Sequence, residues 1–418
     1  MSSPPSFTRS FLDASKAQAC VHCGLCLSAC PTYLETGNEN DSPRGRIYIM
    51  RALEEQRLAL DELSTGPIDR CLGCRACEVA CPSGVQYGAL LEETREHIEQ
   101  HHRRPLRERL WRWGIEFVFS RPVLLRMALI PARLIRAARL GWLLPRVMRE
   151  ALALLPPSQP ATPIPVLSPA AGSPKRQVGF LRGCVMQVLF ARTNAASVKL
   201  LNQSGCDVLT PPEQGCCGAL FAHSGRLDAA RDCARKNIAT FEAQPVDAIV
   251  VNAAGCGSML KEYGHLLKDD PAWRERAARF SEKVRDLVEE LKPAKAVSAR
   301  ATTPLKVTYH DACHLAHAQR ICTAPRDLVR AIQGVDLLEL TEASMCCGSA
   351  GSYNLTEPQM AAQLQERKCA HIVATGADVV LTSNPGCLLQ IQAGLERAGA
   401  GHIRVEHIAD FLEREQYH

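Results

Sequence analysis

Residues 19–31 read ACVHCGLCLSACP and residues 70–82 read RCLGCRACEVACP, so one cysteine spacing occurs twice in the first hundred residues. Three thiolates spaced by two residues can surround one corner of an iron–sulfur cube, and in two-cluster proteins the fourth cysteine ligates the other cluster. We therefore expect this stretch to bind two [4Fe–4S] clusters. The expected ligands are Cys20, Cys23, Cys26 and Cys81 for the first cluster, and Cys71, Cys74, Cys77 and Cys30 for the second.

Zinc is the other metal that paired CxxC segments bind. Zinc would account for four ligands in each site, but not for the third evenly spaced cysteine or for the prolines at 31 and 82. Arg44 and Arg46 follow the first motif. They either place positive charge near an anionic cluster, which would favour its reduced state, or belong to a solvated turn.

The composition is that of a globular protein with redox or metal chemistry. The chain has 418 residues, 46% of them hydrophobic, 20 cysteines and a formal net charge of +5. Its first residues, MSSPP, lack the apolar core of a signal peptide, so we expect a cytoplasmic protein. Twenty cysteines then favour metal binding over a disulfide framework. No window of about 20 residues is apolar and uncharged, so we expect no transmembrane helix.

The distribution of cysteines and prolines predicts an α-helical two-cluster ferredoxin domain followed by an α/β domain of two tandem Cys-Cys-Gly repeats. Seven prolines fall within residues 156–174, a composition typical of a linker. The expected parts are a two-[4Fe–4S] ferredoxin-type domain (1–100), a basic amphipathic helical segment (101–155), a Pro-rich linker (156–174), a first Cys-Cys-Gly unit (175–300) and a second one (301–418).

The internal repeat defines the second half of the chain. In the first unit Cys184 precedes the pair Cys216-Cys217 by 32 positions, and Cys256 follows the pair by 39. The corresponding gaps in the second unit are 33 and 40. Two units that agree to one residue at both gaps indicate a real repeat. Short β-branched runs (178–181, 248–251, 307–309 and 379–381) alternate with helical patterns such as 195–203 and 359–375, which predicts α/β architecture.

The repeat cysteines follow predicted strands or begin predicted helices, so they should lie at one edge of each sheet. Because related units usually pack with pseudo-symmetry, we expect them to converge at the interface between the units, in a cleft that holds a further cluster or binds the electron acceptor. The alternative is that they are small buried hydrophobes. The candidate residues are Cys184, Cys216, Cys217, Cys256, Cys313, Cys346, Cys347, Cys387, His310 and His314.

The side chains around Cys313 have alternative roles. His310, Asp311 and His314 could relay protons or hydrogen-bond a bound oxygen ligand, and Asp311 could equally cap a helix. The other four cysteines of this half lack a counterpart in the repeat, so we expect ordinary core residues. They are Cys206, Cys233, Cys322 and Cys369.

Between Arg103 and Arg149 there are twelve arginines and only two acidic residues, interleaved with large apolar side chains. This pattern predicts one or two basic amphipathic helices, broken at Pro122, Pro131 and Pro145. Such helices lie on anionic membrane surfaces, bind an acidic partner or cap a domain with their arginines solvated. No nucleic-acid-binding motif accompanies the charge, so we expect no nucleic acid.

No G-x-G-x-x-G follows a predicted strand and no Walker motif is present. We therefore expect that this chain binds neither flavin nor nicotinamide, has no catalytic residues for an organic substrate and does not oxidise such a substrate alone. A cluster-based sensor is a further possibility, but it would need a DNA-binding module.

The paired cysteine motifs and tandem Cys-Cys-Gly units resemble the glycolate oxidase iron–sulfur subunit family over essentially the whole chain. Its wider group includes heterodisulfide reductase and an iron–sulfur protein of the anaerobic glycerol-3-phosphate dehydrogenase. The resembling segments are ACVHCGLCLSACP (19–31), PRGRI (43–47), RCLGCRACEVACPSG (70–84), GCCGA (215–219), KEYG (261–264), YHDACHL (309–315) and CCGSAG (346–351).

The resemblance implies a relay subunit of a glycolate or D-lactate dehydrogenase complex. An FAD-binding partner would oxidise the substrate, and this chain would pass electrons to a membrane quinone or similar acceptor, peripherally on the inner face of the cytoplasmic membrane. The alternative is a heterodisulfide-reductase-like catalytic subunit that reduces a disulfide or quinone at the Cys-Cys-Gly units. Heterodisulfide reductase has a fifth cysteine in each unit where this chain has Met259 and Gln390, which weakens a five-cysteine cluster.

Overall fold

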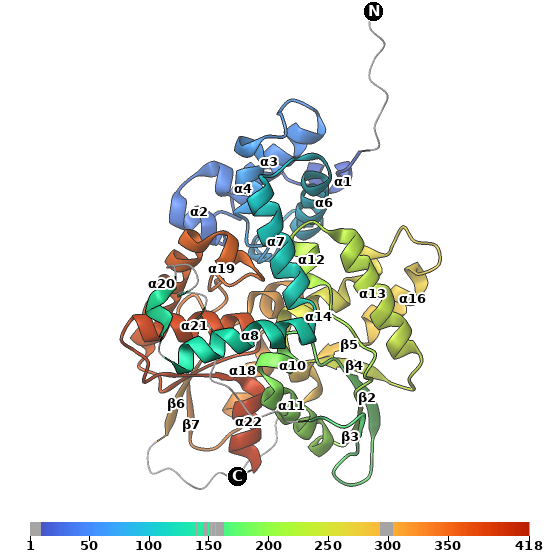
Figure 1. The fold of residues 1–418 in the computed structure, drawn as a ribbon, viewed down its shortest axis with the longest axis vertical. Helices are drawn as coiled ribbons and strands as arrows, with labels where there is room; N and C mark the ends of the chain where they lie inside the picture. The colour runs from blue at the N-terminus through green and yellow to red at the C-terminus, as the bar shows by residue number, and fades with distance from the viewer. Residues whose placement is uncertain are drawn as a thin grey trace, which may run out of the picture.

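The computed structural model describes residues 10–138, 140–144, 149, 152, 155, 163–292 and 304–417. Seen in Figure 1, a helical domain lies at the top and two α/β units lie side by side beneath it, the second on the left and the first on the right. The predicted fold class is confirmed: the amino-terminal part is helical, and the remainder contains two largely parallel sheets.

The helical domain is built from short helices around a small core. Ser42 caps α3 by accepting from the Gly45 amide, and Asp61 forms a capping box with Ser64 at the start of α4. Their apolar faces meet α6 around Met50. The helices are α1 (Ala14–Gln18), α2 (Pro31–Thr36), a 3-10 turn (Glu39–Asp41), α3 (Pro43–Glu54), α4 (Glu62–Asp69), α5 (Ala76–Val79) and α6 (Tyr87–His101).

Two further helices, α7 (Leu106–Phe119) and α8 (Pro122–Ala137), connect this domain to the rest and are followed by a 3-10 turn (Leu140–Leu143). In Figure 1, α7 descends from the helical domain and α8 crosses the front of the α/β units. The predicted break at Pro122 is a helix start, but the break at Pro131 is wrong, because α8 continues through it. Packing of Leu125 and Leu129 against the first unit holds this helix in place. Pro145 lies outside the described residues.

The first Cys-Cys-Gly unit has a five-stranded sheet of order β1-β3-β2-β4-β5, parallel except for β1. Strand β1 lies within the stretch expected to be linker, because it completes the sheet edge beside β3. The elements are β1 (Leu167–Ser168), β2 (Arg176–Phe180), α10 (Met186–Leu189), α11 (Ala191–Gln203), β3 (Cys206–Leu209), α12 (Ala219–His223), α13 (Leu227–Glu242), β4 (Ala248–Val251), α14 (Ala254–Lys261), α15 (Tyr263–Leu266), α16 (Arg274–Lys283), β5 (Val284–Asp286) and α17 (Leu287–Glu290).

The second unit has a four-stranded parallel sheet of order β7-β6-β8-β9, which matches β3-β2-β4-β5 of the first. The repeat seen in the sequence is thus a repeat of topology. The elements are β6 (Leu305–Tyr309), a π-helix (His314–Ala318), α18 (Thr323–Arg330), β7 (Val335–Leu338), α19 (Tyr353–Thr356), α20 (Pro358–Thr375), β8 (Val379–Thr382), α21 (Pro385–Arg397), β9 (Arg404–His407) and α22 (Ile408–Tyr417).

Polar contacts fix the helical domain on the junction of the two units. Tyr353 donates its hydroxyl to the carbonyl of Arg70 at 2.8 Å, and Arg95 donates to the carbonyl of His223 at 2.8 Å. One contact comes from the second unit and the other from the first. The domain that carries both cysteine motifs is therefore anchored to each repeat.

Candidate iron–sulfur and thiol sites

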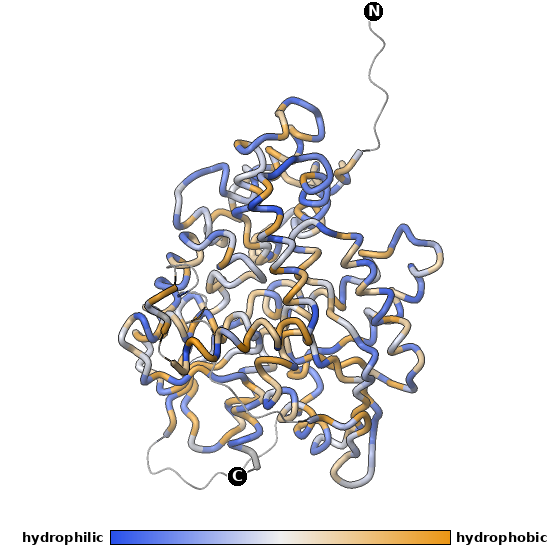
Figure 2. Tube along the Cα trace, viewed as in Figure 1, coloured by the Kyte–Doolittle hydropathy of each residue, from blue (hydrophilic) through white to orange (hydrophobic). Residues whose placement is uncertain are grey.

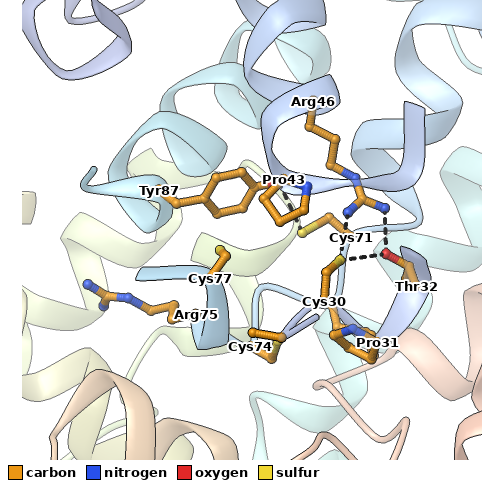
Figure 3. Close-up of a pocket in the computed structure, with 12 residues that line it drawn as sticks. Cys30, Pro31, Thr32, Pro43, Arg46, Cys71, Cys74, Arg75, Cys77 and Tyr87 are labelled. Carbon is orange, nitrogen blue, oxygen red and sulfur yellow. Dashed lines mark hydrogen bonds between the residues drawn. The ribbon is translucent and has the colours of Figure 1, made fainter. Parts of the chain in front are cut away.

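The second cysteine motif lines a cavity in the helical domain. Figure 3 shows the side chains of this cavity, with Arg46 and Tyr87 on one side. The cysteines that line it are Cys30, Cys71, Cys74 and Cys77. This is the set expected from crossed ligation, in which one cysteine comes from the first motif. The ligation itself stays a prediction, and the structure brings the four residues to one place.

The guanidinium of Arg46 provides positive charge at this cavity. Arg46 is buried, donates to the carbonyl of Pro67 at 2.7 Å and lies 3.8 Å from the Cys30 sulfur. Burial alone would raise the pKa of Cys71, but the charge of Arg46 lowers it below its ordinary value. Tyr87 also donates its hydroxyl to the Cys71 sulfur at 3.4 Å. The site therefore favours a thiolate, the form that binds metal.

Two other thiols of the pocket, Cys74 and Cys77, are desolvated without such help. Burial raises the pKa of Cys74 and of Cys77 well above the ordinary value. Thiols buried close together lose hydration, which metal coordination can replace. Four soft donors, a buried cation and a hydroxyl donor fit an anionic iron–sulfur cluster.

The first motif is more open to solvent. Cys23 is exposed, and Cys20, Cys26 and Cys81 are partly buried. Gly24 has a φ of +86°, and a Cβ built there would lie 2.7 Å from Arg44. Arg44 donates to the carbonyl of His22 at 3.2 Å and pairs with Glu39. Of the two arginines singled out in the sequence, Arg44 thus lies at the first motif and Arg46 at the second.

The second motif lies directly against the second Cys-Cys-Gly unit. Cys74 and Leu72 share a hydrophobic cluster with Cys346 of the repeat, and Cys313 packs at its edge. His314 forms a hydrogen bond between Nε2 and the carbonyl of Gly73 at 3.1 Å. His314 therefore contacts the loop of the second motif. Direct packing between the second motif and the repeat thiols is suited to electron exchange between these two sites.

In the first unit the thiols form a chain of close contacts. The sulfurs of Cys184 and Cys216 are 3.5 Å apart, and those of Cys217 and Cys256 are 3.2 Å apart. The Cys216 thiol beside Cys233 on α13, together with burial, raises the pKa of Cys233. Cys233, expected to be an ordinary core residue, packs against the core and also lies beside the repeat thiols. The cysteine spacing of the repeat does not predict this contact, because the packing of α13 brings Cys233 to Cys216.

The second unit repeats this chain. The neighbouring Cys313 thiol lowers the pKa of Cys346, although burial opposes the shift. The sulfurs of Cys347 and Cys387 lie within 4.8 Å of each other. Asp311, one of the flanking candidates, instead pairs with both terminal nitrogens of Arg326 at 2.8 Å. It is thus held by an ion pair.

The residues at the positions of the missing fifth cysteines, and the cysteines outside the repeat pattern, have different surroundings. Met259 is buried in the core, and the Gln390 amide donates to the carbonyl of Ala361 at 3.1 Å. Cys206 and Cys369 are core residues as expected, whereas Cys322 is exposed because it lies between the π-helix and α18.

The loops that carry the repeat cysteines face one another across the units. The amide of Ala254 donates to Ser383 at 3.1 Å, and the His223 and His314 rings meet edge to face at 5.1 Å. A pocket at this junction is lined by Cys71, His223 and three arginines but by none of the eight repeat cysteines. Neither this pocket nor the one at the second motif is lined by both cysteine sets, so the expected shared cleft stays a prediction.

Two cysteine motifs in a helical domain, one of which lines a pocket, joined to a doubled thiol-bearing α/β unit, define an iron–sulfur protein. The model for a 4Fe-4S dicluster domain matches residues 16–85, and the model for a cysteine-rich domain matches residues 178–261 and 307–392. The two matches to one domain confirm the repeat.

Similarity to curated proteins extends along the chain. It is 42% identical to a probable glycolate oxidase iron–sulfur subunit of Bacillus subtilis, over 96% of this chain and 94% of that protein. It is 37% identical to the glycolate oxidase iron–sulfur subunit of Escherichia coli, over 95% and 93%. A lactate utilization protein A of Shouchella clausii is 33% identical over 56% of this chain and 97% of its own length.

The chain belongs to the family of glycolate oxidase iron–sulfur subunits, as its sequence resemblance predicted. It is thus an iron–sulfur subunit of an oxidoreductase. A hypothetical protein from Helicobacter pylori shares the fold, with a TM-score of 0.55 and 9% identity over 98% of this chain and 74% of that chain.

Proposed function

We propose that this chain relays electrons within a flavin-dependent glycolate or D-lactate dehydrogenase complex. It would accept them from an FAD-binding partner subunit and deliver them to a quinone or similar acceptor. The names of the relatives support the substrate class. A [4Fe–4S] cluster supplies one-electron transfer, and two of them would be held by the eight motif cysteines.

The observation that carries the proposal is the contact between the second motif and the second unit. Cys74 packs with Cys346, and His314 is bonded to Gly73 in the same loop. The first motif, by contrast, has an exposed cysteine, Cys23. A surface site joined through a buried site to further thiols is suited to receive electrons from a partner and pass them inward.

The test combines metal analysis with reconstitution. Anaerobically purified chain should contain about eight irons in the two amino-terminal sites and show broad cluster absorption. Alone it should not oxidise glycolate or D-lactate with an artificial acceptor. Addition of the FAD-binding subunit should give activity that is lost in Cys74→Ser. Turnover by the isolated chain, or zinc in place of iron in these sites, would overturn the proposal.

We further propose that α7 and α8 place the protein on the anionic inner face of the cytoplasmic membrane. Val123, Met127, Ile130 and Leu134 form one exposed stripe of α8, with Leu134 64% exposed. Figure 2 shows much orange along α8 even though this helix lies on the outside of the molecule. Within the described residues, no helix is both long and apolar enough to cross a membrane.

Vesicle flotation tests this arrangement. Each basic residue that reaches an anionic surface contributes about 1 kcal/mol, and salt screens that attraction. The triple change of Arg126, Arg133 and Arg136 to Glu should abolish salt-sensitive flotation with phosphatidylserine vesicles. The matched control changes three exposed arginines of the first unit: Arg274, Arg279 and Arg285. Equal flotation of both variants would assign the stripe to a protein contact instead.

A further inference from the structure

His310 follows strand β6 and is buried in the second unit, with 1% of its surface exposed. Neither of its ring nitrogens has a hydrogen-bond partner among the described residues. A buried polar group without a partner is costly, and such groups are rare in folded proteins. The imidazole therefore needs a partner that the polypeptide itself does not supply.

The ring faces two thiols. One nitrogen of His310 and the sulfurs of Cys347 and Cys387 all lie within 4.8 Å of one another, and all three residues are buried. Zinc–sulfur bonds of about 2.3 Å and zinc–nitrogen bonds of about 2.0 Å place donors on one ion roughly 3.5–4 Å apart. A small inward movement would bring all three donors onto one metal.

The neighbouring polar groups have other partners. Asp311 is held by Arg326, and His314 by the carbonyl of Gly73. Asn384 donates to the Cys387 sulfur at 3.6 Å and can orient it. Among the candidates that flank Cys313 in the sequence, His310 is thus the one that faces the thiols.

The first unit lacks this imidazole. The residue three positions before its first cysteine is Leu181, a buried apolar side chain, where the second unit has His310. The extra donor of the first unit is Cys233, which contacts the opposite end of the thiol chain at Cys216. The two units therefore offer different donors although their folds match.

We propose that His310, Cys347 and Cys387 form a mixed imidazole–thiolate metal site in the second unit, which takes zinc or an iron of an iron–sulfur centre. Both metals accept this donor set. Exchange of a thiolate for a neutral imidazole removes one negative charge, and in Rieske centres histidine ligation raises the reduction potential.

Metal binding at this set needs Cys347 and Cys387 as thiolates, so it would release thiol protons and strengthen as the pH rises.

The experiment uses the full-length chain, purified anaerobically and then incubated with Zn²⁺ or with ferrous iron and sulfide. Iron and zinc are counted for the unaltered chain and for His310→Ala and His310→Cys. His407→Ala is the matched control, since His407 is equally buried in the same unit but bonds the carbonyl of Asn252 at 2.8 Å. Cluster absorption and circular dichroism check that each variant is folded.

His310→Ala should lose one zinc, or the iron in excess of about eight per chain, whereas His310→Cys and His407→Ala keep it. Loss of zinc identifies a single ion, and loss of iron identifies a cluster. If His310→Ala fails to fold, the unaltered chain is used to test for a histidine ligand. Pulsed EPR of the iron form should show nitrogen coupling from ¹⁵N-histidine, or X-ray absorption of the zinc form should show a zinc–nitrogen distance. Unchanged metal in His310→Ala, or no zinc and no iron beyond the two amino-terminal sites in the unaltered chain, would overturn the proposal.

Discussion

The two ferredoxin motifs have the same cysteine spacing but very different surroundings. Cys23 of the first motif is exposed, whereas Cys74 of the second is buried beneath Cys346 of the second unit. Arg44 beside the first motif is paired in solvent, and Arg46 beside the second is enclosed. Spacing therefore selects the metal chemistry, while packing determines how far each site is removed from water.

The largest expected difference comes from removing one ligand of each motif. Cys23→Ser and Cys74→Ser should each lose or convert one cluster, up to about four of the eight irons. Cys74→Ser should also lower the melting temperature more, because it leaves an unsatisfied group in the buried contact with the second unit. Iron analysis and thermal unfolding measure both effects.

Cys322→Ser is the control, since Cys322 is exposed and distant in sequence from both motifs. Cys30→Ser sharpens the comparison, because crossed ligation places its effect on the second-motif cluster although Cys30 belongs to the first motif. If the EPR signal of the first-motif cluster is lost instead, the crossed assignment is wrong.

A second difference concerns the two arginines. Arg46→Met should destabilise the protein by about 3 kcal/mol, because it removes one partner of a buried ion pair with Asp41 (3.5 Å) and a donor to Pro67. Arg44→Met should have a much smaller effect, because its pair with Glu39 is solvated. Urea unfolding under anaerobic conditions compares them, and equal losses would contradict the proposed difference in burial.

Access by small molecules should also differ between the motifs. A water-soluble iron chelator should remove iron from the first motif faster than from the second, because Cys23 is exposed and Cys30, Cys71 and Cys74 are buried. The kinetics of iron release should show two phases of similar size. The fast phase should disappear in Cys23→Ser and persist in Cys74→Ser. A single phase in the unaltered chain would remove this distinction.

The smallest expected effect is that of Tyr87→Phe, which deletes the hydroxyl that donates to the Cys71 sulfur. A hydrogen bond to sulfur stabilises the more negative, reduced state, so its loss should lower the reduction potential of the second-motif cluster. The stability cost should be about 1 kcal/mol. Redox titration followed by EPR measures the shift, and the exposed Tyr48→Phe serves as control. A shift confined to the first-motif signal would reverse the assignment.

Much of this architecture follows from local sequence patterns. The two cysteine motifs, the repeat and the α/β alternation are short-range signals, because cluster binding and strand formation both depend on nearby residues. The helix break predicted at Pro131 fails for the opposite reason. Leu125 and Leu129 pack on the first unit, and this tertiary contact overrides the local tendency of proline to end a helix.

By itself, the sequence determined the class of protein, the eight motif cysteines and the pairing of repeat cysteines by position. Only the tertiary structure decided which side chains surround them. Cys233 reaches Cys216, His310 faces Cys387, and His314 turns to Gly73. The physical reason is that ligand spacing is local along the chain, whereas burial, charge and unpartnered donors depend on residues brought together by packing from distant segments.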